Sequence, residues 1–177
     1  MAIEFNVNFV KLRPYGILKL IQAILPCAIY VVLLSPGSFV AVLSLNSLLY
    51  AIVSLICHVC GVHRRTFRLG NTYFILPFTL FDFIASLIFT VGYVIAAWVS
   101  VISAIDGLLT SGLLFLSFLF ASVLCMAAVA AHVYFTMLLY QTCADGQIVQ
   151  LTNVVNEGDR LVPREMSVNN AAEYEEI

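Results

Sequence analysis

A run of 30 residues from Phe74 to Ser103 is almost wholly apolar and contains a single acidic residue, Asp82. An ordinary core helix is shorter, whereas a helix that crosses a bilayer needs about 20 residues at 1.5 Å each. Inside lipid every backbone N–H and C=O must be paired within the segment, which a helix achieves. The run therefore predicts a transmembrane helix, with Asp82 about 12 Å from its Phe74 end.

The overall composition supports the same class. The chain has 177 residues, of which 62% are hydrophobic and 10% charged, and its mean hydropathy is +1.03. Soluble domains average about half apolar and about a quarter charged residues, so these values exclude an ordinary water-soluble domain. The length suits one domain. Because there is no basic face, we expect no nucleic-acid partner.

Three further apolar segments accompany this run. We predict transmembrane spans at about residues 15–34, 39–60, 74–103 and 112–140. The residues Ser35 to Ser38 form a turn between the first two spans, and a short link at about 104–111 joins the last two. The predicted fold is an all-α polytopic membrane protein, a four-transmembrane-helix bundle.

This bundle would occupy residues 15–142, after an N-terminal segment at 1–14. The tail at 143–177 is polar and lacks the hydrophobic periodicity of a packed element, so we expect it to be disordered.

The basic residues predict the orientation of the bundle. With four spans, all eight fall on one face of the membrane: Lys11, Arg13, Lys19, Arg64, Arg65, Arg68, Arg160 and Arg164. Lys and Arg near span ends are retained in the cytoplasm, so the N- and C-termini and the middle loop should be cytoplasmic. The opposite face has only two short links, which leaves no sizeable extracellular domain.

Polar residues of the four spans fall at similar depths. Counted from the cytoplasmic end of each span, Asp82 and His132 lie about 12 Å deep, Gln22 and Tyr50 or Ser54 lie near that level, and Lys19 is shallower. Two interpretations stay open. One is a proton- or ion-linked site on Asp82 and His132. The other is an interhelical hydrogen-bond layer, which we favour because the outer halves of the first, third and fourth spans look too apolar for a transport path.

Small residues recur every four positions on the last two spans. These stripes are Gly92, Ala96 and Ser100, and Ser117, Ala121 and Cys125. Such stripes let helix backbones approach closely in lipid, either inside the bundle, which we favour, or in self-association within the membrane plane.

The cysteines and the middle loop each carry a candidate membrane contact. Juxtamembrane thiols suit reversible palmitoylation, and Cys57, Cys60 and Cys143 have that position, although plain apolar packing explains them equally well. A lone Cys57-x-x-Cys60 is weak evidence for zinc or thiol chemistry, so we expect no metal, cofactor or enzyme activity.

The loop arginines Arg64, Arg65 and Arg68 would face anionic lipid. Three charges are fewer than a usual lipid-binding cluster, and their role in topology is a sufficient explanation.

The chain's last four residues form a Tyr-x-x-apolar motif from Tyr174 to Ile177. It resembles the sorting signal that clathrin adaptors bind in an unstructured tail. Its Glu-Glu-Ile context also resembles an SH2 ligand when Tyr174 is phosphorylated, and it is compatible with some PDZ grooves. A solvated acidic tail is the alternative without function. Among the functional interpretations of this motif, binding to a cytoplasmic adaptor fits a multipass membrane protein best.

The segment Asn8 to Leu20, NFVKLRPYGILKL, the four spans, and the pair Phe81-Asp82 before an apolar run to Trp98 resemble the MARVEL-domain proteins. The resemblance covers about residues 5–142. It implies a membrane-organising role without chemistry of its own, in vesicle trafficking, membrane apposition, cell junctions or cell–cell fusion such as myoblast fusion.

We therefore expect a non-enzymatic protein of the plasma membrane or intracellular vesicles. Its partners would be the lipid bilayer, other membrane proteins or further copies in the membrane plane, and cytoplasmic adaptors. The alternative is a small ion- or proton-coupled transporter or channel that uses Asp82.

Overall fold

The computed structural model describes residues 7–33, 38–62, 66–69, 72–143 and 147–163. Four long α-helices dominate it, in chain order α1 (Tyr15–Leu33), α2 (Phe39–Val59), α3 (Phe78–Thr110) and α4 (Gly112–Gln141). The shorter elements are the 3-10 helices η1 (Val7–Lys11) and η4 (Ile148–Asn153) and the strands β1 (Thr66–Leu69), β2 (Thr72–Ile75), β3 (Val154–Asn156) and β4 (Leu161–Pro163). All four α-helices are long and apolar enough to cross a membrane, which confirms the predicted number of candidate spans.

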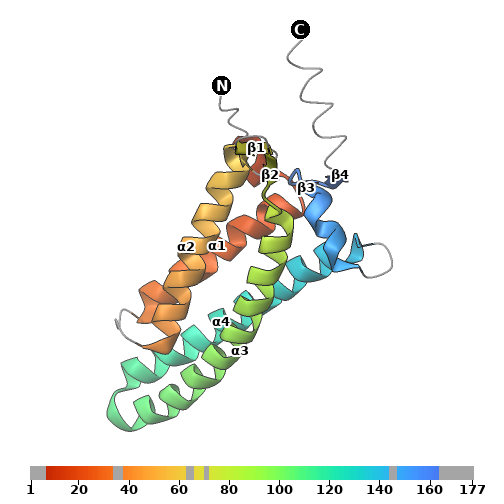
Figure 1. Ribbon diagram of the computed structural model, residues 1–177. Helices are drawn as coiled ribbons and strands as arrows, with labels where there is room; N and C mark the ends of the chain where they lie inside the picture. Colours follow the sequence, from red (N-terminus) through yellow and green to blue (C-terminus); the bar gives the residue numbers. More distant parts are fainter. Residues whose placement is uncertain (1–6, 34–37, 63–65, 70–71, 144–146, 164–177) are drawn as a thin grey trace.

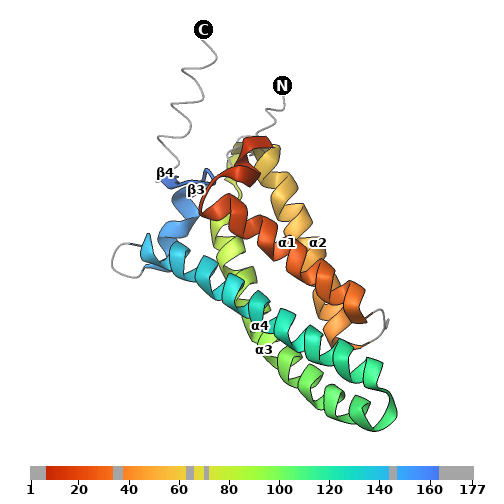
Figure 2. The same cartoon turned by 180° about the vertical axis from the view of Figure 1, so that it is seen from behind.

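The helices form two antiparallel hairpins, α1–α2 and α3–α4, that pack against each other through α1 with α4 and α2 with α3. Two antiparallel strand pairs, β1–β2 and β3–β4, lie with η1 at one end of the bundle (Figure 1). The view from behind shows the α3–α4 hairpin reaching beyond the α1–α2 hairpin at the other end (Figure 2). The first and last described residues therefore lie at the same end, as four antiparallel helices require.

The third helix differs from the predicted span at both ends. Phe74 belongs to β2, and α3 begins only at Phe78, directly after Pro77. Proline disfavours helical backbone at the residue before it but fits at a helix start, so the helix begins there rather than within the apolar run. Asp82 is consequently about 6 Å, not 12 Å, from the start of its helix.

The predicted link at 104–111 is also wrong. Helix α3 continues through Thr110, and only Ser111, with extended backbone, separates it from α4. A Cβ atom on Gly107 would lie 3.0 Å from the backbone nitrogen of Phe115. The two helices can therefore approach closely enough for a one-residue turn because position 107 has no side chain.

The stripes of small residues lie mainly inside the bundle. Ala96, Ser100, Ala121 and Cys125 are completely buried. A Cβ atom on Gly92 would lie 2.9 Å from the Leu43 side chain of α2. These contacts favour internal packing over self-association for this surface.

The tail is not disordered throughout, contrary to the expectation for residues 143–177. Leu151 and Val155 are each only 1% exposed, and Leu151 packs with the apolar side chains of Tyr15, Phe83 and Leu139. Secondary-structure periodicity could not reveal this segment, because its stability depends on contacts with helices far away in the sequence. Residues 164–177 lie outside the described part.

Hydrogen bonds from backbone and side-chain donors hold the docked tail at the helix starts. The Gly158 carbonyl accepts from the backbone N–H groups of Tyr15 (3.0 Å) and Gly16 (3.2 Å), and the Thr79 hydroxyl donates to the Val154 carbonyl (2.8 Å). The first N–H groups of a helix lack partners within the helix, so the tail satisfies donors of α1 that would otherwise need water or a cap.

We predict that Gly158→Ala weakens this docking and lowers the free energy of unfolding by about 1–3 kcal/mol. Gly158 has a φ of +99°, and an added Cβ atom would lie 3.0 Å from the side chains of Leu12 and Phe9. Unfolding in detergent micelles can be followed through the fluorescence of Trp98, the chain's one tryptophan. The matched control is Gly112→Ala, whose Cβ atom meets no other atom within 4 Å. Equal stability of both variants would contradict a docked tail.

Candidate functional site

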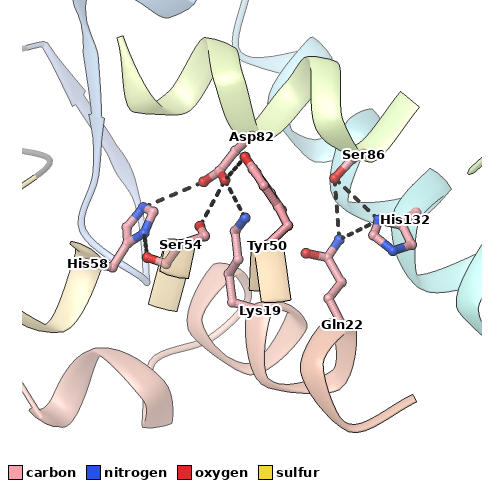
Figure 3. Close-up of polar contacts among 8 residues, drawn as sticks. All are labelled: Lys19, Gln22, Tyr50, Ser54, His58, Asp82, Ser86 and His132. Atoms are coloured by element: carbon pink, nitrogen blue, oxygen red, sulfur yellow. Dashed lines mark hydrogen bonds and ion pairs between the residues drawn. The ribbon is translucent and has the colours of Figure 1, made fainter. Parts of the chain in front are cut away.

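Asp82 is the centre of a buried ionic layer between three helices. Its Oδ1 atom lies 2.6 Å from the Lys19 Nζ atom of α1, and the two side chains are 2% and 1% exposed (Figure 3). Each residue lies four positions after the first residue of its helix, Phe78 or Tyr15. Because α1 and α3 both start at the same end of the bundle, equal distances from the helix starts bring the two charges together.

Helix α2 supplies two further donors to the same carboxylate oxygen. The Tyr50 hydroxyl and the Ser54 hydroxyl each donate to Asp82 Oδ1 at 2.9 Å. The Lys19 ammonium also lies 4.7 Å from the centroid of the Phe135 ring of α4. The ion pair is thus surrounded by hydrogen-bond donors and an aromatic face, which offset part of the cost of removing two charges from water.

His58 lies on the other side of the carboxylate. Its Nδ1 atom is 2.8 Å from the Ser54 carbonyl oxygen, and its Nε2 atom is 3.7 Å from Asp82 Oδ2. A carbonyl oxygen only accepts, so Nδ1 must carry the proton of a neutral ring. The Nε2 contact with Asp82 becomes an ion pair when a second proton binds there. The ring of Phe9, fully buried, stacks on His58 with centroids 4.7 Å apart and covers it from the η1 side.

A second cluster lies beside the first and joins α1, α3 and α4. The Gln22 Nε2 atom is 3.2 Å from His132 Nδ1 and 3.5 Å from the Ser86 hydroxyl, which is itself 3.4 Å from His132 Nδ1 (Figure 3). Since an amide nitrogen only donates, His132 Nδ1 accepts and the ring proton of neutral His132 is on Nε2. This cluster can fix the relative rotation of three helices.

The structure therefore brings the five predicted layer residues into two neighbouring groups. Lys19 and Tyr50 contact Asp82, and Gln22 contacts His132. Within the described residues no hydrogen bond or ion pair joins Asp82 to His132. Counted from Phe74, Asp82 would lie at the depth of His132. Counted from the observed helix start at Phe78, Asp82 lies at the depth of Lys19, which it contacts.

Sequence reasoning missed His58 and Ser86 as members of the layer. Helical spacing contains the signal: His58 follows Ser54 by four residues, and Ser86 follows Asp82 by four, so each pair shares one helix face.

Buried polar residues also continue into the other half of the bundle. Ser44 and Ser47 of α2 and Tyr93 and Ser100 of α3 are buried. The outer half of the third span therefore carries two buried hydroxyl groups, and the expectation that it is too apolar for a transport path stays a prediction. Serine and tyrosine change the mean hydropathy of a span only slightly, so that average does not reveal that their hydroxyl groups lie together in the interior.

The remaining candidate residues divide by location. Cys57 and Cys60 are half-buried, whereas Cys143 is buried and burial raises the pKa of its thiol. Palmitoylation stays a prediction. Arg64, Arg65, Tyr174 and Ile177 lie outside the described residues, as does the side chain of Arg68, whose backbone pairs with Tyr73. The described residues contain no group of three or more His, Cys, Asp or Glu side chains that could hold a metal ion.

We predict that Lys19→Met lowers the free energy of unfolding by about 3–5 kcal/mol, because it leaves the Asp82 carboxylate buried without its counter-charge. Adding Asp82→Asn should restore part of the loss, since the neutral amide still accepts from Tyr50 and Ser54. Unfolding in mixed micelles measures both. Lys11→Met, at an exposed lysine in η1, is the matched control and should have little effect. Additive losses in the double variant would contradict a coupled pair.

Comparison with known proteins leaves the family of this chain open. No family model, curated protein or solved structure matches it. The MARVEL resemblance therefore stays a prediction.

Proposed function

We propose that this chain is a non-enzymatic, MARVEL-type membrane protein that organises membrane domains in vesicle trafficking, membrane apposition or cell–cell fusion and junctions. The observation that carries the proposal is the closed environment of Asp82. One carboxylate oxygen accepts from Lys19, Tyr50 and Ser54, which join α1, α2 and α3. A carboxylate bound in this way holds three helices together.

The outer surface of the helices supports the same role. Large apolar side chains are exposed along all four helices, among them Ile24, Val53, Trp98 and Val123. In a membrane these side chains face lipid, while the polar side chains are mostly inside. A protein of this kind interacts with its surroundings through its lipid-facing surface and its ends, rather than through a reactive site.

The ends provide the proposed cytoplasmic contacts. The described chain begins and ends on one side of the bundle, and the positive-inside rule assigns that side to the cytoplasm. The basic loop would face anionic lipid there. Tyr174 and Ile177 would bind a cytoplasmic adaptor and direct the protein between vesicles and the plasma membrane.

We predict that Tyr174→Ala causes the tagged protein to accumulate at the plasma membrane, because an adaptor that needs the tyrosine ring can no longer retrieve it. Imaging of living cells measures the ratio of vesicular to surface protein. Glu175→Ala is the matched control, since the middle positions of a Tyr-x-x-apolar signal are variable, and it should distribute like the parent chain. Identical distributions for all three chains would remove the sorting function of the tail.

The second candidate function is an ion- or proton-coupled transporter or channel. It is favoured by the buried hydroxyls of Ser44, Ser47, Tyr93 and Ser100, which extend the polar interior beyond the Asp82 layer. These groups give a transport path more polar sites than the sequence alone indicated.

We predict that Asp82→Asn, when folded and reconstituted in vesicles, has the same proton and cation permeability as the parent chain, because the proposed role of Asp82 is structural. A pH-sensitive dye inside the vesicles measures proton flux under an imposed potential. Protein-free vesicles give the background. Flux above background that is lost in Asp82→Asn, with assembly unchanged, would support the transporter instead.

A further inference from the structure

The face of α2 that points away from the bundle carries exposed side chains at helical spacing. Its exposed side chains include Phe39, Val42, Asn46, Leu49, Val53 and Ile56. Their spacings of 3, 4, 3, 4 and 3 residues are those of the seam in a left-handed pair of helices, which repeats every 3.5 residues. Within the bundle, α2 is in contact with α1, α3 and η1.

Asn46 is the exception on this face. All the remaining exposed residues of α2 (Phe39–Val59) are apolar. Asn46 lies about 10 Å from the start of the helix and about 20 Å from its end, which places it within the hydrocarbon core of a bilayer. A carboxamide in that position is unfavourable unless its polar atoms find partners.

The hydrogen bond that Asn46 makes within the described chain satisfies only part of its carboxamide. Its Nδ2 atom donates to the Val42 carbonyl at 2.9 Å. A carboxamide has a second N–H group and an oxygen with two acceptor positions. These atoms point to a partner outside the chain, because hydrocarbon offers neither donor nor acceptor.

We infer that this face of α2 binds a second copy of the same chain in the membrane plane, with the two Asn46 side chains hydrogen-bonded to each other. Identical copies with the same topology place Asn46 at the same depth, so a two-fold axis along the membrane normal brings the residues together. A carboxamide is both donor and acceptor and is therefore complementary to itself. The apolar seam residues on either side pack as knobs into holes, and Asn46 fixes their register.

This inference is independent of the proposed trafficking function. It also concerns a different surface from the small-residue stripes, whose members Ala96, Ser100, Ala121 and Cys125 are buried inside one bundle. The alternative occupants of the α2 face are lipid alone or a different membrane protein, and the experiment below separates both from a second copy.

We predict that the purified full chain, labelled with donor or acceptor dyes and reconstituted in phosphatidylcholine vesicles, shows energy transfer that falls on dilution with lipid. Asn46→Leu should raise the apparent dissociation constant about tenfold, the effect of losing one or two interhelical hydrogen bonds. Asn46→Gln, which keeps a carboxamide, should retain most of the association. Ile88→Val, on the exposed face of α3, is the control and should have no effect.

A compensating variant tests whether an asparagine elsewhere on the same seam can replace Asn46. Position 53 lies seven residues after position 46 on the same seam, so Asn46→Leu combined with Val53→Asn should restore association. Circular dichroism and gel filtration confirm that each variant is folded. The inference is overturned if the parent chain shows no energy transfer at high protein-to-lipid ratio, which leaves lipid or another protein as the occupant. It is equally overturned if Asn46→Leu associates as tightly as the parent.

Discussion

The buried ion pair between Lys19 and Asp82 is the interaction on which the arrangement of the helices depends. A single charge within a bilayer is strongly unfavourable, and even a pair is tolerated only with good geometry and further hydrogen bonds. The 2.6 Å contact and the donors Tyr50 and Ser54 meet that condition, and they come from three different helices. Any change in the rotation of one helix would leave a charge or a hydroxyl without its partner. The layer therefore defines which helix faces lie inside.

Segments near both ends of the described chain cover this layer at the helix starts. Phe9 covers His58, and the Gly158 carbonyl binds the first N–H groups of α1, so η1 and the docked tail lie over the helix starts. The same segments belong to the side that the basic residues predict to be cytoplasmic.

The bundle places most of its hydroxyls and the Lys19–Asp82 pair inside and many large apolar side chains outside, which is the arrangement expected when lipid is the solvent. Interior hydroxyls such as those of Ser47 and Tyr93 extend the polar region along α2 and α3. Asn46 departs from the pattern, because it is a carboxamide on an otherwise apolar outer face. In lipid such a residue indicates a contact with another polypeptide as directly as a large apolar patch does on a soluble protein.

The sequence by itself determined the four membrane-length helices and the identity of most residues in the polar layer, because hydropathy is a local property and charged residues are rare in such segments. Only the tertiary structure decided that Asp82 pairs with Lys19 rather than His132, and that residues 147–163 dock on the helix starts. These features depend on the relative position and rotation of helices that are distant in the sequence. A shift of one helical turn, about 5 Å, exchanges one partner for another without changing any local pattern.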